Sequence, residues 1–399
     1  MKILIVSQYF WPESFKINDL ACELQKQGHE ITVLTGMPNY PEGQYFTGYS
    51  TFSPRTETYN SITIKRVPLV PRGNSNSLRL ILNYLSFAFT ASILAPFYCK
   101  EKCDAIFVFQ TSPVTVGIPA VLLKKLKKAK LFFWIQDLWP ETLLATKATK
   151  SKFIYKIFEK LSAWLYKNSD KILIQCKGFA KSVKDKNISD DKIAYFPNWA
   201  DVPSVTETIT PENMPEGFIV MFAGNLGTSQ ALDTIVAAAE KLKTHSDIHF
   251  VILGDGRQAE WMKKQVENKS LQHQVHFLGR HPASHMPAYF ECADVLLVTL
   301  NRDPVFALTI PSKIQAYLAA GKPIIGALDG FAADVIKESN AGFSGDAEDA
   351  DALAENILRC YNLSKTELQQ LGLNAKQYSD QEFNREKLIR QLTEWLSKA

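Results

Sequence analysis

Two glycine-containing loops in the second half of the sequence are typical of anion binding. In FAGNLGTSQALD, Gly224 and Gly227 lie between a strand-like run and a helix-like run, where free backbone N–H groups can hold a phosphate. In LGDGR, Arg257 follows the glycines and is expected to begin the next helix, and a guanidinium pairs well with phosphate oxygens. The spacing is not G-x-G-x-x-G, which argues against a nicotinamide dinucleotide site. Each loop alone is equally consistent with a tight turn that binds nothing.

A third stretch, TIPSKIQAYLAAGKP (309–323), predicts a helix that begins near an anion and ends at a glycine. Ser312 is the predicted N-cap, and Lys313 falls in the first turn. A lysine at a helix N-terminus is unfavourable unless an anion is bound there. A solvated lysine beside an ordinary cap is the alternative. Because all three loops follow strands of one half, we expect them together to form a site for a nucleoside diphosphate.

Polar residues also follow the predicted strands of the first half. In WIQDLWPE, Asp137 and Glu141 come after a buried-type strand and are flanked by tryptophans. Carboxylates in this position can act as bases or contact sugar hydroxyls, and tryptophan faces often line sugar sites. A loop carboxylate that caps a helix is the alternative. The same rim is expected to include Glu13, Asn39, Tyr40, Thr111, Ser112, Trp139 and Asn198.

These residues need two sheets to position them. The chain has 399 residues, which is too long for one ordinary core, and strand-like and helix-like runs alternate along it. This order predicts two doubly wound, Rossmann-like parallel sheets that face each other across a cleft. We place an N-terminal domain at 1–198 and a C-terminal domain at 199–380. The last segment, 381–399, is expected to form a helix at about 381–398 that crosses back to the N-terminal domain. SITIKRVPL (61–69) is expected to be an edge strand.

Metal and disulfide chemistry find little support in the sequence. The six cysteines form no C-x-x-C pair and fit a reduced compartment. The one D-x-D, Asp349 to Asp351, opens a predicted helix, where acidic residues stabilise the N-terminus. No cleavable signal peptide is recognised at MKILIVSQYF, so we expect a cytoplasmic protein.

Charge is unevenly distributed along the chain. Residues 1–200 carry 27 Lys+Arg against 15 Asp+Glu, whereas residues 201–399 carry 18 against 26. The basic half also contains an almost wholly apolar run at 79–98, beside the lysine-rich stretches 124–130 and 147–167. Together they predict a peripheral helix docked on anionic lipid, with a true span or a merely solvated basic face as alternatives. Nucleic acid is disfavoured because no aromatic platform is interleaved with the basic residues.

With these motifs in order, the chain resembles the retaining glycosyltransferases of family 4, which have the GT-B fold. The resemblance rests on YFWPE with NDLACELQKQGHEITVLTG, then FAGNLG, FVILGDGR, VHFLGR, ADVLLVTL and PSKIQAYLAAGKPIIGALDG. The QDLWPE and TIPSK loops are similar to those of the O-antigen and capsule branch, which includes a proposed N-acetyl-L-fucosamine transferase. The resemblance implies that the C-terminal domain binds a nucleotide-diphosphate sugar, that the N-terminal domain binds the acceptor, and that no metal or other cofactor is needed.

The resemblance also implies roles for individual residues. Donor binding is expected at Gly224, Asn225, Gly227, Gln230, Asp255, Gly256, Arg257, Gly279, Arg280, Ile310, Pro311, Ser312, Lys313 and Gln315. Acceptor binding is expected at Asn39, Tyr40, Thr111, Ser112, Trp139 and Glu141, and catalysis at Asp137, Gln136 and Glu13. The family's usual pair of glutamates maps to Leu308 and Ala316, so other residues must hold the ribose; Gln315, Asn225, Gln230 and Arg257 are the candidates.

The expected function is transfer of a sugar from a donor, expected to be UDP-linked, to a polyprenyl-diphosphate-linked saccharide at the inner face of the cytoplasmic membrane. Two alternatives stay open. A nucleotide-sugar 2-epimerase also uses two facing Rossmann domains, and it would isomerise free nucleotide sugar without an acceptor. A degenerate partner subunit would bind the nucleotide without turnover.

Overall fold

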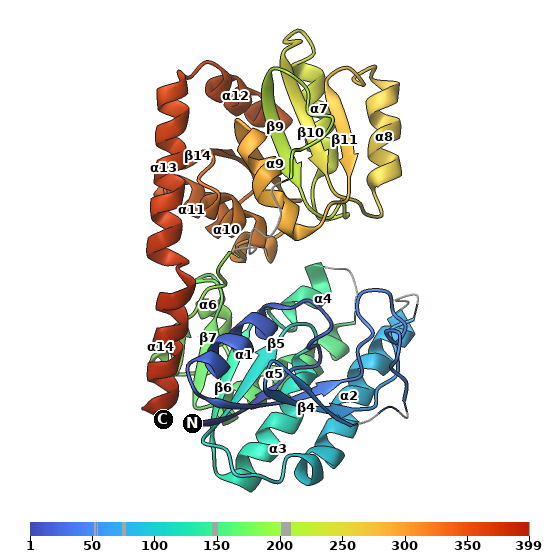
Figure 1. The fold of residues 1–399 in the computed structure, drawn as a ribbon, viewed down its shortest axis with the longest axis vertical. Coiled ribbons are helices and arrows are strands. Elements are labelled where there is room, and N and C mark those ends of the chain that lie inside the picture. The colour runs from blue at the N-terminus through green and yellow to red at the C-terminus, as the bar shows by residue number, and fades with distance from the viewer. Residues whose placement is uncertain (52, 54, 74–76, 146–150, 201–208, 399) are drawn as a thin grey trace. The chain divides into compact units, whose positions relative to one another are not determined.

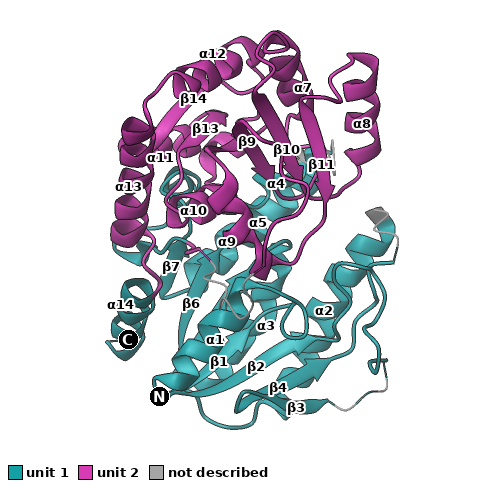
Figure 2. Cartoon of the chain, turned by 45° about the horizontal axis from the view of Figure 1, so that its top comes forward, with its two compact units in different colours: residues 1–197, 386–399 teal, residues 198–385 magenta. Residues whose placement is uncertain are grey.

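The computed structural model describes all 399 residues except 52, 54, 74–76, 146–150, 201–208 and 399. The chain divides into two compact units, coloured separately in Figure 2. Unit 1 comprises residues 1–197 and 386–399, and unit 2 comprises residues 198–385. Each is a parallel sheet with helices on both faces (Figure 1). The expected fold class of two Rossmann-like α/β domains is therefore confirmed.

Unit 1 contains an eight-stranded sheet in the order β3-β4-β2-β1-β5-β6-β7-β8. The strands are β1 (Lys2–Val6), β2 (Glu30–Gly36), β3 (Thr56–Tyr59), β4 (Ile62–Val67), β5 (Ala105–Gln110), β6 (Lys130–Ile135), β7 (Lys171–Ile174) and β8 (Ile193–Tyr195). Central strands such as β5, AIFVFQ, are buried along their whole length because helices cover both faces. β4 is not the edge strand expected from its alternating pattern, because β3 pairs antiparallel along its outer side.

The helices of unit 1 divide between the two faces of its sheet. They are α1 (Lys16–Lys26), α2 (Ser77–Tyr98), α3 (Gly117–Lys127), α4 (Glu141–Ala145), α5 (Lys152–Asn168), α6 (Phe179–Lys184) and α14 (Arg385–Ser397). The chain moves outward from β1 to β2 through α1, and in the opposite direction from β4 to β5 through α2. Right-handed crossovers therefore place α1 on one face and α2, α3 and α5 on the other, where α3 packs between α2 and α5.

Helix α14 lies against unit 1 although it ends the chain. Its Leu388, Ile389 and Leu392 are buried, and the Trp395 ring lies 6.1 Å from that of Phe196, which follows β8. Thr393 Oγ1 donates a 3.0 Å hydrogen bond to Gln27 at the end of α1. The last helix therefore completes the N-terminal unit.

Unit 2 contains a six-stranded parallel sheet in the order β11-β10-β9-β12-β13-β14. The strands are β9 (Phe218–Ala223), β10 (Ile248–Leu253), β11 (Val275–Gly279), β12 (Val295–Thr299), β13 (Ile324–Ala327) and β14 (Gly342–Gly345). The helices are α7 (Leu232–Lys241), α8 (Ala259–Asn268), α9 (Met286–Cys292), α10 (Ser312–Ala319), α11 (Phe331–Glu338), α12 (Ala350–Tyr361) and α13 (Lys365–Glu382). A cluster of buried apolar side chains lies between the sheet and α7, α8 and α12.

Both sheets reverse their strand order beside the first strand, between β1 and β5 in unit 1 and between β9 and β12 in unit 2. Open parallel sheets bind ligands beyond the carboxyl ends of the strands at this reversal. The loops after these strands are therefore where each unit should carry its chemistry.

Candidate functional site

In unit 2, the loops after β9 and β10 pack directly against each other through glycine. A Cβ on Gly254 would lie 1.8 Å from the carbonyl oxygen of Gly224, and one on Gly256 would lie 2.5 Å from that of Leu226. Gly224 also has φ +143°, a conformation that side chains other than glycine rarely adopt. The two loops are joined by a hydrogen bond of 2.9 Å from the Leu226 N–H to the Asp255 carbonyl. The predicted glycines thus shape one compact edge.

The start of α10 closes this edge with Lys313. A Cβ on Gly224 would lie only 2.4 Å from Lys313 Cε, so the absence of a side chain there makes room for the lysine. Lys313 Nζ donates to Gln230 Oε1 and lies 3.6 Å from the centre of the Phe222 ring. Burial lowers the pKa of Lys313 to about 7. No carboxylate lies within 4.0 Å of its ammonium in the described part of the chain.

The loop after β9 is held by the end of β12. Asn301 Oδ1 accepts the N–H of Ala231 at 2.9 Å, and Asn301 Nδ2 donates to the Thr228 carbonyl at 2.9 Å. Thr299 Oγ1 donates to the carbonyl of Gln230. The loop that presents Gln230 to Lys313 is therefore fixed from its neighbouring strand rather than free to rearrange.

Helix α10 is itself anchored to β9. The Tyr317 hydroxyl accepts the Ala223 N–H at 3.1 Å and donates to the Ala223 carbonyl at 3.2 Å. Two positions before it, Gln315 is 1% exposed, and its Nε2 has no hydrogen-bond partner within the described residues. A buried amide donor without a partner is costly, which makes Gln315 a good candidate for a ligand contact.

The remaining donor-site predictions divide into exposed and structural residues. Arg257, Arg280 and Asn225 are exposed at loop positions after β10, β11 and β9. Asp255 Oδ1 accepts the N–H of Gly256, so it stabilises its own turn. Ile310 is buried beneath α10.

Two details of the predicted helix starts are wrong. Ser312 is not the N-cap of α10: Pro311, with φ −59° and ψ 140°, occupies the cap position, and Ser312 is the first helical residue. Arg257 does not begin α8, which starts at Ala259.

Leu308 lies in the turn before α10 and Ala316 lies within α10, and both are half-buried.

In unit 1, Glu13 joins the loops that follow β1 and β2. It is 1% exposed; its Oε1 accepts the N–H groups of Asn39 and Tyr40, each at 2.8 Å, and its Oε2 accepts that of Phe10 at 3.2 Å. Burial raises the pKa of Glu13 to about 7, against the opposing effect of these three hydrogen bonds. The carboxylate is thus committed to shaping the loops that carry Asn39 and Tyr40.

Asp137 follows β6 and meets the loop after β5, one strand away from the reversal point between β1 and β5. Its Oδ2 accepts the Ser112 hydroxyl at 2.9 Å, and Trp139 Nε1 donates to the same Ser112 oxygen at 3.1 Å. Burial raises the pKa of Asp137. Trp139 is 4% exposed and its ring packs on Phe158, so its indole positions Ser112 and its face is not available to a sugar.

The other first-half predictions lie nearby along the chain but take different roles. Glu141 Oε1 accepts from Lys186 Nζ at 2.9 Å and from the Ser182 hydroxyl, which ties α4 to α6. The Thr111 carbonyl accepts Gln110 Nε2 at 2.9 Å. Gln136 receives a 3.3 Å hydrogen bond from Gln175 at its carbonyl.

Sequence reasoning missed Arg72, which follows β4. Its Nη1 donates to the Tyr9 hydroxyl at 3.1 Å, and its guanidinium carbon lies 4.9 Å from the centre of the Tyr40 ring. The signal present in the sequence was the short VPRG run directly after a strand, but nothing local marks which loops it meets.

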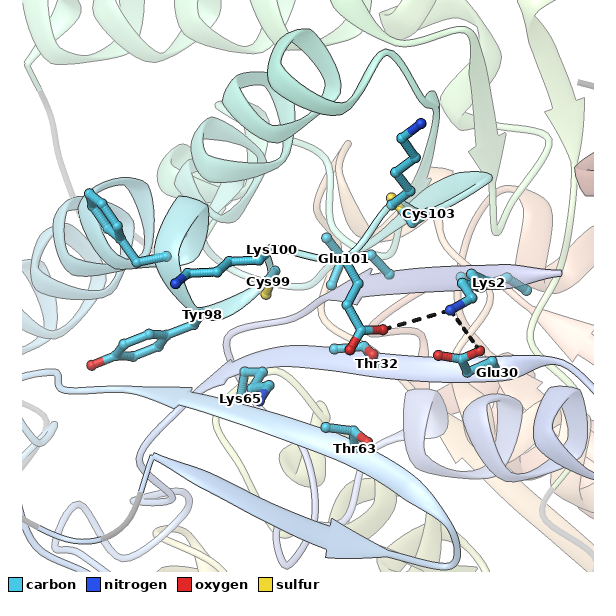
Figure 3. Close-up of a pocket in the computed structure, with 14 residues that line it drawn as sticks. Lys2, Glu30, Thr32, Thr63, Lys65, Tyr98, Cys99, Lys100, Glu101 and Cys103 are labelled. Atoms are coloured by element: carbon cyan, nitrogen blue, oxygen red, sulfur yellow. Dashed lines mark ion pairs between the residues drawn. The ribbon is translucent and has the colours of Figure 1, made fainter.

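A separate pocket of about 380 Å³ lies at the opposite, amino-terminal edge of the unit 1 sheet (Figure 3). It is lined by the starts of β1 and β2 and by the loop 99–103. Lys2 there pairs with Glu30 at 3.2 Å and with Glu101 at 3.8 Å. This pocket lies away from the carboxyl ends of the strands, and its charged side chains already form ion pairs. It is therefore a poorer candidate for the chemistry predicted above.

Unit 1 also exposes an apolar surface, here called the α2 face. It comprises Leu78, Ile81, Leu82, Leu85, Phe89, Ile93 and Phe97 of α2, with Leu122 and Leu126 of α3 and Phe153, Ile154, Ile157 and Trp164 of α5. These side chains are 36–73% exposed. By length and a mean hydropathy of 1.6, Leu78–Tyr98 would also suffice to cross a bilayer. The first residues of the predicted basic stretch 147–167 lie outside the described part of the chain.

The D-x-D sequence serves a helix start. Asp349 Oδ1 accepts the Ala352 N–H at 2.9 Å and caps α12, whereas Asp351 pairs with Lys241. Within the described residues, no group of three or more His, Cys, Asp or Glu side chains is arranged to hold a metal.

Comparisons with known families cover almost the whole chain. The model of "Glycosyl transferase 4-like domain" matches residues 16–199, and that of "Glycosyl transferases group 1" matches residues 206–378. Among curated proteins, WcaI of Escherichia coli (strain K12), a glycosyl transferase assigned to colanic acid biosynthesis, is 25% identical across 98% of both chains. WbjE of Pseudomonas aeruginosa, assigned as a glycosyltransferase, is 26% identical across 72% of this chain and 73% of its own.

Solved structures share the fold at low identity. Sucrose-phosphate synthase from Thermosynechococcus elongatus has a TM-score of 0.74 at 15% identity and covers 100% of this chain and 98% of its own. HepE of Anabaena, solved in complex with UDP and glucose, has a TM-score of 0.69 at 15% identity and covers both chains fully. At this identity the likeness is one of fold alone.

Proposed function

Since the chain is a GT-B glycosyltransferase of group 1 type, we propose that it transfers a sugar from a UDP-linked donor to a polyprenyl-diphosphate-linked saccharide. We propose further that the anomeric configuration is retained and that the product enters an O-antigen or capsule polysaccharide. N-acetyl-L-fucosamine is the first donor sugar to test, because the QDLWPE and TIPSK loops resemble that branch of the family.

One observation carries the donor part of the proposal. Lys313 is packed between Gly224 and Phe222 with no carboxylate within 4.0 Å in the described residues. A largely buried cation lacking a counter-ion is costly, so the site is suited to an anion that completes it. The diphosphate of a nucleotide sugar would supply that charge beside the glycine loops.

The same lysine would assist the reaction itself. Charge builds up on the leaving diphosphate as the bond to the sugar breaks, and a fixed cation in a water-poor site stabilises that charge. The proposal needs no metal for this step, because Lys313 and the backbone N–H groups near it would share the charge. Asp137 and Gln136, in the loop after β6 of unit 1, are the side chains proposed to act on the sugar or on the acceptor hydroxyl.

The α2 face supports a lipid-linked acceptor at the cytoplasmic face of the membrane. Among the described residues, thirteen large apolar side chains are exposed on α2, α3 and α5, against two on unit 2. Lysines occupy the same helices, among them Lys124, Lys125 and Lys127 of α3. An apolar face bordered by cations favours the surface of an anionic bilayer. A 2-epimerase acting on free nucleotide sugar would have no need of this face.

A thermal-shift screen tests the donor. UDP, GDP and dTDP with their sugars are each added to the full chain, since a ligand that binds only the folded state raises its Tm. UDP and a UDP-N-acetylaminosugar are expected to give the largest shifts. A larger shift with GDP or dTDP would overturn the choice of base. Isomerisation of the free nucleotide sugar without acceptor would favour the epimerase, and tight binding without turnover on any acceptor would favour a partner subunit.

A further inference from the structure

Two arginines that follow one another closely in unit 1 have opposite surroundings. Arg66 on β4 is fully buried, pairs with Glu57, and donates to the Gly36 carbonyl at 2.9 Å. Arg72, six residues later, has no carboxylate within 4.0 Å in the described part of the chain. Its Nε is buried without a hydrogen-bond partner there. Arg66 is a satisfied structural arginine, whereas Arg72 retains unused donors and an unbalanced charge.

Arg72 is nevertheless held in place. Its N–H donates to Asn39 Oδ1 at 3.2 Å, and its Nη1 donates to the Tyr9 hydroxyl at 3.1 Å. The guanidinium carbon lies 4.9 Å from the centre of the Tyr40 ring and 5.9 Å from that of Tyr9. These rings are 5.5 Å apart, and each also packs on Phe15. A guanidinium fixed by aromatic faces is preorganised to receive a planar or tetrahedral anion.

The nearby carboxylates are already engaged. Both oxygens of Glu13 accept backbone N–H groups, and Asp137 Oδ2 accepts the Ser112 hydroxyl. Neither is within ion-pair distance of Arg72. Neither carboxylate balances the charge of Arg72, so an anionic ligand could pair with it.

The helix beside Arg72 indicates which kind of ligand. Asn83 of α2 is fully buried and donates to Asn39 Oδ1 at 3.2 Å, the same oxygen that accepts the Arg72 N–H. Tyr84 follows it and interacts electrostatically with Arg72 and Asp137. On the same turns, Ile81, Leu82 and Leu85 are 43–52% exposed on the α2 face. An anion site and a lipid-facing surface thus share two turns of one helix.

We propose that Arg72, with the phenol of Tyr9, binds the diphosphate of a lipid-linked acceptor whose hydrocarbon lies along the α2 face. The inference rests on the proposed function, and it assigns Arg72 as a residue that binds the acceptor. Charge-assisted hydrogen bonds from a fixed guanidinium fork would hold the phosphate oxygens, while the exposed side chains of α2 contact the lipid.

The test measures binding of farnesyl diphosphate, inorganic diphosphate and UDP to the full chain by calorimetry. Wild type is compared with Arg72→Gln, Arg72→Lys and a matched loss of surface charge, Lys26→Gln, in the last turn of α1. Arg72→Gln is expected to weaken farnesyl diphosphate binding roughly ten- to hundredfold, because hydrogen bonds to a charged group are lost. Arg72→Lys keeps the charge without the fork and should give an intermediate loss. Lys26→Gln should change nothing, and UDP binding should be equal in all four proteins.

Three results would overturn the inference. Unchanged farnesyl diphosphate binding in Arg72→Gln would remove Arg72 from the site. Inorganic diphosphate binding as tightly as farnesyl diphosphate would show a free-anion site, and an equal loss of UDP binding would assign Arg72 to the donor. If Arg72→Gln does not fold, an unaltered affinity in Arg72→Lys counts against the proposal in the same way. If wild type transfers the sugar and Arg72→Gln has the same KM for the acceptor, this inference is contradicted and the proposed function is not. If farnesyl diphosphate binding depends on Arg72 but no turnover is seen, the proposed function is contradicted and this inference is not.

Discussion

The ammonium of Lys313, in the first turn of α10, lies 3.6 Å from the centre of the Phe222 ring on β9. The ring face stabilises the cation in part, and Gln230 accepts one of its hydrogens. Neither group balances the charge, so burial lowers the pKa of Lys313 to about 7. Lys313 is therefore only partly protonated at neutral pH.

The first prediction follows from this pKa. A bound diphosphate favours the charged lysine, so binding must take up a proton wherever free Lys313 is neutral, which is above about pH 7. UDP affinity should fall by up to about tenfold per pH unit as the pH rises above 7. Calorimetric titrations at pH 6.5, 7.5 and 8.5, in buffers of different ionisation enthalpy, measure both the affinity and the proton uptake.

Lys313→Arg and Lys313→Met are the matched controls for this titration. Arginine stays charged throughout the range, so its UDP affinity should be nearly independent of pH. Methionine should bind UDP roughly tenfold or more weakly at pH 6.5, and also without pH dependence. A wild-type affinity that does not change between pH 6.5 and 8.5 would show that Lys313 does not meet the diphosphate.

The second prediction concerns the space beside Lys313. In Gly224→Ala, the new methyl group would lie 2.4 Å from Lys313 Cε and would displace the lysine, so UDP binding should weaken by at least about tenfold. Gly28→Ala is the control, because Gly28 also has a positive φ, of +85°, but a Cβ there meets nothing within 4 Å. Gly28→Ala should lower the Tm slightly and leave UDP affinity intact. Equal affinities in the two variants would contradict the arrangement.

The third prediction separates stability from activity at Asp137. Burial raises the pKa of Asp137, so the folded state prefers the neutral acid and loses stability as the pH rises through the raised pKa. Asp137→Asn removes this cost and still accepts the Ser112 hydroxyl. Its Tm at pH 8 should therefore be higher than that of wild type.

If Asp137 acts on the sugar or the acceptor, the same variant should lose turnover by about 10²-fold or more with donor KM unchanged. Asp137→Asn that is stabilised and fully active would remove Asp137 from catalysis. Loss of both stability and activity would instead show that its charge holds the loop.

The fourth prediction tests the α2 face. The paired substitution Phe89→Asp and Ile93→Asp removes two side chains that are 67% and 48% exposed, so folding should be unaffected. Burying one such side chain in lipid is worth about 1.5–3 kcal/mol. Binding to vesicles of phosphatidylcholine and phosphatidylglycerol, measured by co-sedimentation, should therefore weaken by roughly 100-fold or more. Leu373→Asp is the control in unit 2, because Leu373 is 63% exposed on α13. High salt should weaken wild-type binding only in part. Identical binding by the two mutants would refute the proposed membrane surface.

The fifth prediction concerns metal. In the proposed reaction, Lys313 and backbone N–H groups stabilise the charge on the leaving diphosphate. Turnover should therefore be unchanged by about 5 mM EDTA, an amount in excess of any trace metal. A loss of turnover that Mg²⁺ restores would require a metal in the reaction.

The donor side of the site could be predicted largely from local signals. Glycines after strands and a lysine at a helix start are recognisable in sequence, and the structure brings Gly224, Gly256 and Lys313 to one edge. The prediction of the N-cap of α10 was wrong. Ser312 is a residue type preferred at N-caps, but Pro311 before it already has the extended conformation of a cap. No local pattern marks the short strand β14, because Gly342–Gly345, GFSG, has no apolar alternation.

The acceptor side depends on contacts that no local pattern encodes. The surroundings of Arg72 are set by Tyr9 in the loop after β1 and by Asn39 and Tyr40 in the loop after β2. Trp139 was a reasonable sugar-binding prediction, but only the fold reveals that its ring is buried against Phe158. Pairing of β3 outside β4 likewise depends on a tertiary hydrogen-bond ladder, and a strand's own alternation does not report its neighbour.

The central claim is that this chain transfers a sugar from UDP to a lipid-linked acceptor. Wild type, Lys313→Met and Arg72→Gln are incubated with a UDP-N-acetylaminosugar and a prenyl-diphosphate-linked saccharide in anionic vesicles, and the extracted lipid is analysed by mass spectrometry. Wild type should add the mass of one sugar residue to the lipid, with an equal amount of UDP released, and both variants should add far less. Release of UDP without any lipid product, or full activity in Lys313→Met, would contradict the account.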